Sequence, residues 1–248
     1  MKQVLITGAS SGIGQQLATD YANSGWHVYA CGQNQRRLEQ LVTNLDATSI
    51  GKITPLVFDV TNLEQTRQVL AEIETLPDYI ILNAGTCEYI DNGVIESDVF
   101  KRVFEVNFFG IIHCLDAMQS RFTAITHLVF ISSSAAYTAL PRAEAYGASK
   151  AALSYFANGL AIDLKDKVKT VTLVNPGFVA TPLTNKNDFP MPMIVSCEYA
   201  SLKIRQGIEK QQAEIHFPIK FTLLLKAIAL FPVALQRIII QRMTRNAS

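Results

Sequence analysis

The feature that most constrains the fold is a regular alternation of short apolar runs with longer segments of helical length. The apolar runs lie at 3–7, 27–31, 53–58, 79–82, 127–131, 170–174 and 214–217. Each is nearly continuous in apolar residues, which is typical of strands buried on both faces. Helix-length segments fill the gaps at 12–24, 35–44, 62–74, 97–120, 145–165 and 197–210. This rhythm predicts an α/β fold with a doubly wound, mostly parallel sheet of about seven strands and helices on both faces.

The composition favours a protein with some apolar surface to cover. Of the 248 residues, 49% are hydrophobic, so the chain can bury a sizeable core. The 17% of charged residues is below the ~25% of typical soluble proteins. We therefore expect a subunit, a membrane surface or an apolar ligand to cover part of the surface. The net charge of +1 gives no electrostatic reason to expect nucleic-acid binding.

Cysteine and histidine placement predicts neither a metal site nor a disulfide framework. The four cysteines are scattered, with no CxxC and no Cys/His cluster, and no two histidines have the spacing of metal ligands. Reduced thiols in a cytoplasmic protein are the expected state. Strand-like sequence begins at Gln3, so we expect no signal peptide.

A glycine-rich turn follows the first predicted strand and leads into a helical segment. It reads Thr7-Gly8-Ala9-Ser10-Ser11-Gly12-Ile13-Gly14, with the spacing GxxxGxG. Glycines allow a tight turn and a close approach of the backbone to a ligand. The free N–H groups and positive dipole end of the following helix favour a pyrophosphate. The turn therefore predicts dinucleotide binding rather than a glycine-rich turn without a ligand.

Tyr146 and Lys150 lie four residues apart in a predicted helix, and Ser133 precedes the tyrosine by thirteen residues. Four residues is about one helical turn, so the phenol and the ammonium project from the same face. A cation beside a phenol favours the phenolate and lowers its pKa. This pattern is typical of a tyrosine that exchanges a proton with a substrate, although a Tyr–Lys pair also occurs by chance on many helices.

Taken together, the motifs resemble those of the short-chain dehydrogenase/reductase family, with order and spacing in agreement from residue 1 to about residue 218. The resemblance is based on the glycine turn, Asn83-Ala84-Gly85, Asn107, Ser133, the 146–150 run and Pro176-Gly177. It implies a Rossmann-like catalytic domain at 1–218 that binds NAD or NADP, followed by an apolar, basic helical extension at 219–248. The second Asn that the family often has before Asn83 is Leu82 here, which we expect to affect local packing only.

The resemblance also implies contacts along the cofactor. Asp59 and Val60 would contact the adenine, and the 83–85 segment would lie beneath the adenosine ribose. Pro176, Gly177, Val179 and Thr181 would lie near the nicotinamide. The complete predicted cofactor set is Gly8, Ser10, Ser11, Gly12, Ile13, Gly14, Gln33, Asp59, Val60, Asn83, Ala84, Gly85, Tyr146, Lys150, Pro176, Gly177, Val179 and Thr181.

The second strand ends without the acidic residue that NAD-specific members use to hold the ribose hydroxyls. An acid there would repel a 2′-phosphate, so its absence favours NADP over NAD. The Arg that is common in NADP-specific members is replaced by Gln33. Arg36 and Arg37 follow, and they also fit the solvated face of a helix.

For the chemistry, the resemblance implies four residues with separate roles. Tyr146 would pass a proton to or from the oxygen of a carbonyl/alcohol pair, and Ser133 would hold that oxygen. Lys150 would lower the tyrosine pKa and bind the nicotinamide ribose. Asn107 would hold a water that links Lys150 to solvent. Ser132 and Ser134 compete with Ser133, but neighbours in a strand point to opposite faces, and the family register selects Ser133.

The 183–195 segment and the tail stand outside the strand–helix rhythm. The segment contains Phe189, Met191 and Met193, and the family forms a mobile lid here, so we expect an apolar substrate. In the tail, two helices broken near Pro232 are expected, with Leu235, Ile239 and Met243 on one stripe of the second. Peripheral contact with an anionic membrane through 219–248 and a role in covering the pocket or a subunit interface are both open.

The resulting prediction is an NAD(P)-dependent oxidoreductase that acts on a small-molecule carbonyl or alcohol. Family members are commonly dimers or tetramers, so a homodimer or homotetramer is expected. The alternative is a dinucleotide-binding redox sensor or scaffold without turnover, which would be expected to lack the Tyr or the Lys.

Overall fold

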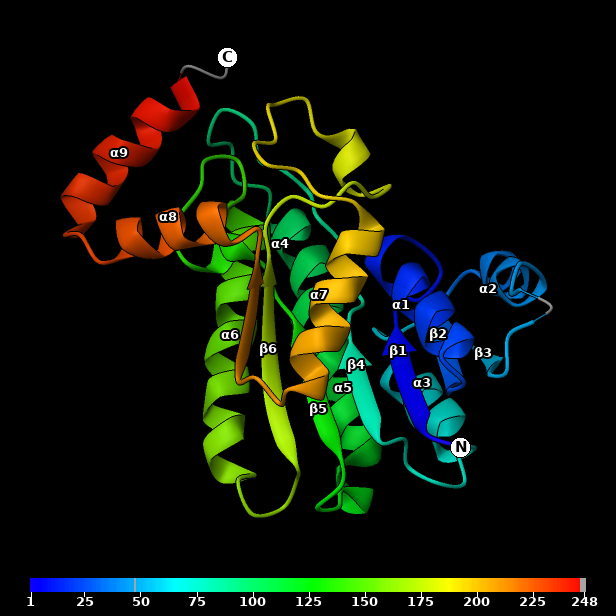
Figure 1. Cartoon of the computed structure of the whole chain (residues 1–248). Coiled ribbons are helices and arrows are strands. Elements are labelled where there is room, and N and C mark those ends of the chain that lie inside the picture. Colours follow the sequence, from blue (N-terminus) through cyan, green and yellow to red (C-terminus); the bar gives the residue numbers. More distant parts are fainter. Residues whose placement is uncertain (47, 246–248) are drawn as a thin grey trace.

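The computed structural model, which describes residues 1–46 and 48–245, forms one sheet from the seven predicted strands (Figure 1). The strands are β1 (Gln3–Thr7), β2 (His27–Gly32), β3 (Lys52–Val57), β4 (Tyr79–Leu82), β5 (His127–Ile131), β6 (Thr170–Pro176) and β7 (Glu214–Phe217). Their order across the sheet is β3-β2-β1-β4-β5-β6-β7, and every neighbouring pair is parallel. The predicted fold class is confirmed, and each strand boundary lies within two residues of its expected position.

Helices cover both faces of the sheet. On one face lie α1 (Gly12–Asn23), α2 (Gln35–Thr43) and α7 (Cys197–Glu209), whose Leu17, Leu38 and Ile204 are buried against the strands. On the other face lie α3 (Leu63–Ala71), α5 (Gly110–Met118) and α6 (Glu144–Asp163), with α4 (Ser97–Phe104) packed on α6. The strand order reverses between β1 and β4, and ligands of open α/β sheets bind in the crevice at such a point.

Local sequence explains where these elements begin and where they are exposed. Asn34, Asn62 and Ser196 cap α2, α3 and α7, because each side chain accepts a hydrogen bond from a backbone N–H in the first turn. The central strand β5 is buried at all five positions. The edge strand β3 exposes Lys52, Pro55 and Val57, and an edge strand tolerates a proline.

The segment at 97–120 differs from the single helix that we expected. A π-helical turn at Glu105–Phe109 separates α4 from α5. Asn107 lies in this turn with its amide directed at the loop around Thr86, and Gly110 packs against Val60. Such turns are frequent at functional sites. Apolar periodicity does not show one inserted residue, which is why the sequence predicted a continuous helix.

The C-terminal residues form two helices, α8 (Ile219–Ala229) and α9 (Val233–Arg245), as expected from the break near Pro232. They leave the end of β7, and α9 projects from the body of the molecule (Figure 1). The expected stripe on α9 is wrong in part. Ile239 and Ile240 pack toward α8, whereas Leu235 and Met243 are exposed. Within the described residues, no helix is long and apolar enough to cross a membrane.

Candidate functional site

A cleft of about 990 Å³ opens at the carboxyl ends of the strands, where the order of the sheet reverses. It runs from the glycine turn after β1, past the ends of β2 and β4, to Tyr146 and Lys150 on α6. Every residue predicted to contact a cofactor lines it except Gly14, and of the four predicted catalytic residues only Asn107 does not line it.

The glycine turn is shaped for close backbone approach. Gly8 and Gly12 have φ of 65° and 56°, a region that favours glycine. Ser11 caps α1 without a side-chain hydrogen bond, so its side chain leaves the first N–H groups of the helix available. A Cβ on Gly14 would lie 2.4 Å from the carbonyl oxygen of Gly8. Gly14 therefore faces the turn and not the cleft, and its lack of a side chain lets the turn pack against the helix.

Asn83 fixes the end of β4 to this turn. Its Nδ2 donates to the carbonyl oxygen of Thr7 at 2.9 Å and to that of Gly8 at 3.3 Å. In return, the Thr7 hydroxyl accepts from the backbone N–H groups of Asn83 and Ala84 at 2.9 and 3.0 Å. The two strand ends on either side of the crevice are thus held as one unit.

Tyr146, Ser133 and Lys150 meet at the other end of the cleft. Ser133 lies close enough to Tyr146 to lower the pKa of its phenol. The Lys150 ammonium is buried, donates to the carbonyl oxygen of Ile131 at 2.9 Å and lies 5.9 Å from the centre of the Tyr146 ring. Ser132 faces away, because its hydroxyl donates to the carbonyl oxygen of Lys150 on α6. The strand therefore presents Ser133, not Ser132, to Tyr146.

Burial dominates the ionisation of this pair. It raises the pKa of Tyr146 to about 12, against the lowering effect of the neighbouring Ser133 side chain. It also lowers the pKa of Lys150 to about 8, since a dry environment disfavours the ammonium. The pKa of Tyr146 is therefore raised overall, because desolvation of the phenol is the largest influence on it and Lys150 directs its ammonium toward Ile131. That Lys150 lowers the tyrosine pKa stays a prediction.

Asn107 is fully buried behind Gly85, with its hydrogen-bonding groups largely occupied. Its Nδ2 donates to the Thr86 carbonyl oxygen and to the Ser149 hydroxyl, each at 2.9 Å. Its Oδ1 accepts from the Thr86 N–H at 2.7 Å. A carbonyl oxygen accepts two hydrogen bonds, so one position remains at Oδ1 for a further donor.

At the far end of the cleft, Gln33, Asn34 and Arg37 lie around the end of β2, and Asp59 and Val60 follow β3. Arg37 is in the first turn of α2, whose N-cap Asn34 accepts from the Arg37 backbone N–H at 3.0 Å. From the sequence, Arg37 also fitted the solvated face of a helix. Its position three residues after a capping Asn was the signal that it lies in the first helical turn, next to the end of the strand.

The 183–195 segment, called the lid below, begins on the wall of the cleft with Leu183 and Thr184. At its base, Ala180 donates its N–H to the Val195 carbonyl oxygen at 2.8 Å, and the Tyr89 hydroxyl donates to Oδ1 of Asn187 at 2.7 Å. Arg142, in the loop before α6, forms ion pairs with Asp188 and Asp91 at 2.7 and 2.8 Å. One arginine thus ties the lid to the loop after β4.

Aromatic rings continue from this lid toward the C-terminal helices. Ring centres of Tyr89 and Phe189 are 5.4 Å apart, those of Phe189 and Phe178 are 6.2 Å apart, and those of Phe178 and Phe221 are 5.6 Å apart. Cys87, which the sequence did not single out as a site residue, lies close enough to Tyr146 and Lys150 to affect both pKa values. Across the described part of the chain, no cluster of three or more His, Cys, Asp or Glu residues could hold a metal ion.

Comparison with known proteins assigns the family. The family model for short chain dehydrogenases matches residues 2–190. An uncharacterized oxidoreductase of Myxococcus xanthus is 35% identical over 225 residues, which cover 88% of this chain and 87% of that protein. The chain belongs to the short-chain dehydrogenase family. As a member of this family, this short-chain dehydrogenase is an oxidoreductase.

Other relatives have longer chains or different names. The 11-beta-hydroxysteroid dehydrogenase-like 2 protein of Arabidopsis thaliana is 32% identical, with coverage of 91% of this chain and 77% of its own. A dehydrogenase/reductase SDR family protein 7-like of Drosophila melanogaster is 33% identical, with coverage of 74% of this chain, and the match spans only 59% of that protein.

Solved structures of short-chain dehydrogenases show the same fold. One from Burkholderia phymatum in complex with NAD has a TM-score of 0.80 at 20% identity and covers 91% of this chain and 92% of its own. One from Sphingobium yanoikuyae in complex with NADPH has a TM-score of 0.79 at 22% identity, with 92% and 93% covered. At this identity the likeness supports the Rossmann-like architecture alone.

Proposed function

We propose that this short-chain dehydrogenase transfers a hydride between a nicotinamide dinucleotide and a carbonyl/alcohol pair, with Tyr146 as general acid/base. The observation that carries the proposal is that Ser133, Tyr146 and Lys150 lie together on the wall of the same cleft that the glycine turn opens. A proton donor and a dinucleotide-shaped turn in one continuous space are what such a reaction needs.

The residues present fit a dinucleotide. Positive φ at Gly8 and Gly12 and the uncapped start of α1 suit a pyrophosphate. The adenosine would lie against Asp59 and Val60, and the nicotinamide near Pro176-Gly177, Val179 and Thr181, all of which line the cleft. When bound, the cofactor supplies or accepts the hydride. Two similar solved structures hold NAD and NADPH, which is consistent with either dinucleotide here.

Among the two dinucleotides we favour NADP. The end of β2 has Gln33 and Asn34 rather than an acidic residue. Arg37, which carries a guanidinium group, also lines the cleft there. A guanidinium pairs well with a phosphate, and a 2′-phosphate distinguishes NADP from NAD.

The protein's share in the reaction is to manage one proton. With a pKa of about 12, Tyr146 holds its proton at neutral pH and can donate it to a carbonyl oxygen as hydride arrives at the carbon. Ser133 would hydrogen-bond the same oxygen. Lys150, whose pKa is about 8, is mostly protonated at pH 7 and would bind the nicotinamide ribose. The free acceptor position on Asn107 would hold a water on the path from Lys150 to solvent.

The substrate that we propose is apolar. The aromatic rings of Tyr89, Phe189, Phe178 and Phe221 form a continuous series from the lid to α8. Aromatic side chains offer large apolar contact areas to a ligand. The steroid dehydrogenase name of one relative is consistent with this substrate class.

We also propose a homodimer or homotetramer in the cytoplasm. Phe109, Tyr155 and Ile162 on the α5–α6 side of the sheet are 44%, 85% and 78% exposed, which is unusual for large apolar side chains of a monomer. Burial of this side against another subunit would account for them.

The decisive experiment compares Tyr146→Phe with Tyr155→Phe, a control on the same helix whose phenol lies outside the cleft. Purified protein is screened with NADPH and NADH against ketones and aldehydes of graded chain length. Loss of the Tyr146 hydroxyl should lower kcat at least about 100-fold, as expected for a general acid, and leave the Kd of the dinucleotide within about twofold. Undiminished turnover would refute the assignment. Binding without hydride transfer on any substrate would favour the sensor or scaffold alternative.

A further inference from the structure

Residues 219–245, with α8 and α9, form a C-terminal hairpin. Only part of its apolar surface packs against the protein, and much of the remainder is exposed. On α8, Phe221, Leu225 and Ile228 are buried against the body of the protein. The opposite face presents Leu223 and Leu224, which are 51% and 46% exposed. A helix that is apolar on both sides is normally covered on both sides.

The turn between the two helices adds the most exposed apolar side chains of the hairpin. Leu230 is 88%, Val233 61% and Phe231 46% exposed. Ile238 continues this surface along α9 at 47% exposed. The turn between α8 and α9 lies at the outer edge of the molecule (Figure 1). Large exposed apolar patches mark contact with a protein or a membrane.

The hairpin is also where the positive charge of the chain is concentrated. The tail after Glu214 contains five Lys or Arg residues and no acidic residue, whereas the whole chain has a net charge of +1. Residues 1–214 therefore carry a net charge of −4. Lys226 is paired with Glu214. Lys220, Arg237 and Arg242 are exposed, and none of them forms an ion pair within the described residues.

Charge decides between the two kinds of surface that would cover the hairpin. In a two-fold dimer the same patch faces itself, so these cations would oppose one another, and juxtaposed like charges oppose association. A bilayer with anionic headgroups accepts both the cations and the apolar side chains. At 11 and 13 residues, the helices suit a position within the interface rather than across it.

We infer that the C-terminal hairpin docks the protein on an anionic lipid surface, with Leu230, Phe231 and Val233 inserted among the lipids and Arg237 and Arg242 at the headgroups. The hairpin is firmly built for this. Nε2 of Gln236 donates to the Phe231 carbonyl oxygen at 2.8 Å and closes the turn. The Glu214 carboxylate accepts from Lys226 on α8 and from Tyr137 near the start of α6, which fixes α8 to the sheet.

Docking in this position would bring the lid close to the lipid. The inner side of the hairpin packs Ile239 and Ile240 with Leu140 and Phe178, next to the lid residue Phe189. An apolar substrate dissolved in the bilayer would then reach the cleft without crossing water. This consequence depends on the proposed function, whereas the docking itself does not.

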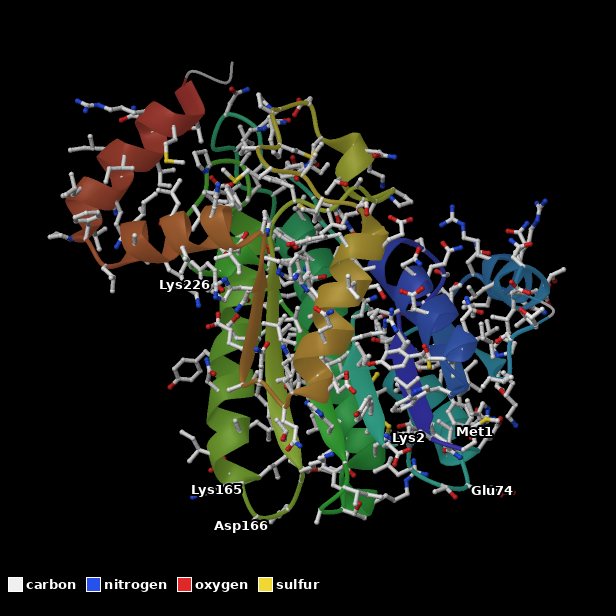
Figure 2. The ribbon with its side chains drawn as sticks, viewed as in Figure 1. Met1, Lys2, Glu74, Lys165, Asp166 and Lys226 are labelled. Atoms are coloured by element: carbon white, nitrogen blue, oxygen red, sulfur yellow. The ribbon has the colours of Figure 1, made fainter. Side chains whose placement is uncertain are left out.

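The test uses full-length protein and sedimentation with two kinds of vesicle, one of phosphatidylcholine alone and one that also contains phosphatidylglycerol. The hairpin variant combines Leu230→Asp, Arg237→Glu and Arg242→Glu. The control combines Ile125→Asp, Lys165→Glu and Lys167→Glu, exposed positions at the opposite end of the molecule, where Lys165 is labelled in Figure 2. Both variants change the net charge equally, and circular dichroism confirms that both are folded.

Wild-type protein and the control should bind the phosphatidylglycerol vesicles and bind phosphatidylcholine weakly. The hairpin variant should lose at least about 20-fold in partition, since each cation near an anionic surface contributes several-fold and two are reversed. Absence of wild-type binding, or equal loss in the control, overturns the proposal. The proposal is also overturned if the wild-type protein does not bind vesicles and sedimentation velocity shows a dimer that the hairpin variant abolishes. The hairpin would then be covered by a second copy of the chain.

Discussion

Lys150→Met should make the protein more stable at neutral pH while it removes activity. The ammonium is buried at 3% exposure, and its hydrogen bond is to a neutral acceptor, the carbonyl oxygen of Ile131 at 2.9 Å. Burial therefore opposes the charged form, and the pKa falls from 10.5 to about 8. Methionine has a similar length and needs no hydration, so the substitution removes the cost of dehydrating a charge.

The size of the effect follows from that pKa. Each pKa unit is worth about 1.4 kcal/mol, so a protonated Lys150 costs the folded state about 3 kcal/mol at pH 7. Loss of the hydrogen bond to Ile131 offsets about 1 kcal/mol of the gain. The net stabilisation of about 2 kcal/mol should raise Tm by about 4–8 °C in a chain of this length.

The pH dependence identifies the cause. Because the folded-state pKa is below the unfolded one, the unfolded chain holds this proton more tightly, and wild-type stability gains as pH rises from about 8 toward 10.5. The cost of Lys150 falls to about 1 kcal/mol at pH 10, and the advantage of the variant should shrink by about 2 kcal/mol.

The assay is thermal unfolding of both proteins at pH 7 and pH 10, without added dinucleotide. Lys165→Met, an exposed position on the turn after α6, serves as the control and should change stability by less than about 0.5 kcal/mol at either pH. The reasoning fails if Lys150→Met is less stable than wild type at pH 7. It also fails if the difference in Tm is the same at both pH values.

Two further predictions concern the ends of the cleft. Arg37→Ala should raise the Kd of NADPH about 10–100-fold, since a charge-assisted hydrogen bond to a phosphate is lost, and leave the Kd of NADH nearly unchanged. Arg36→Ala is the control in the same titration. Equal effects of Arg37→Ala on both dinucleotides would count against the NADP preference. Arg142→Ala should release the lid from Asp188, raise KM about fivefold and speed amide exchange at 187–191. The control Arg67→Ala, which breaks the two ion pairs of this α3 residue, should alter neither KM nor exchange. An unchanged exchange rate in Arg142→Ala would show that the arginine does not hold the lid.

The sequence predicted the sheet well because its signals are local. A strand buried on both faces must be apolar along its whole length, as in β5, and a helix must start where a capping side chain occurs, as at Asn34. The glycine turn was equally readable, since positive φ at Gly8 and Gly12 requires glycine. In each case a single short segment contains the whole physical constraint.

The site was less readable where a property depends on residues distant in sequence. The π-helical turn that directs Asn107 toward Thr86 leaves no mark in apolar periodicity. Cys87 became a neighbour of Tyr146 only because α6 begins at the edge of the sheet where β4 ends. A pattern names the residue types, whereas their proximity requires the fold.

The tyrosine pKa shows most clearly what spacing alone leaves out. Four residues on a helix correctly place a lysine beside a tyrosine, and an isolated cation would lower the pKa of the phenol. Burial acts on both groups and in opposite directions, which brings the Tyr146 pKa to about 12 and the Lys150 pKa to about 8. The same desolvation keeps the phenol protonated for donation and makes the ammonium costly. The expected destabilisation by Lys150 and the proposed proton donation by Tyr146 therefore have one physical origin, the dry end of the cleft, and a variant that rehydrates this end should weaken both.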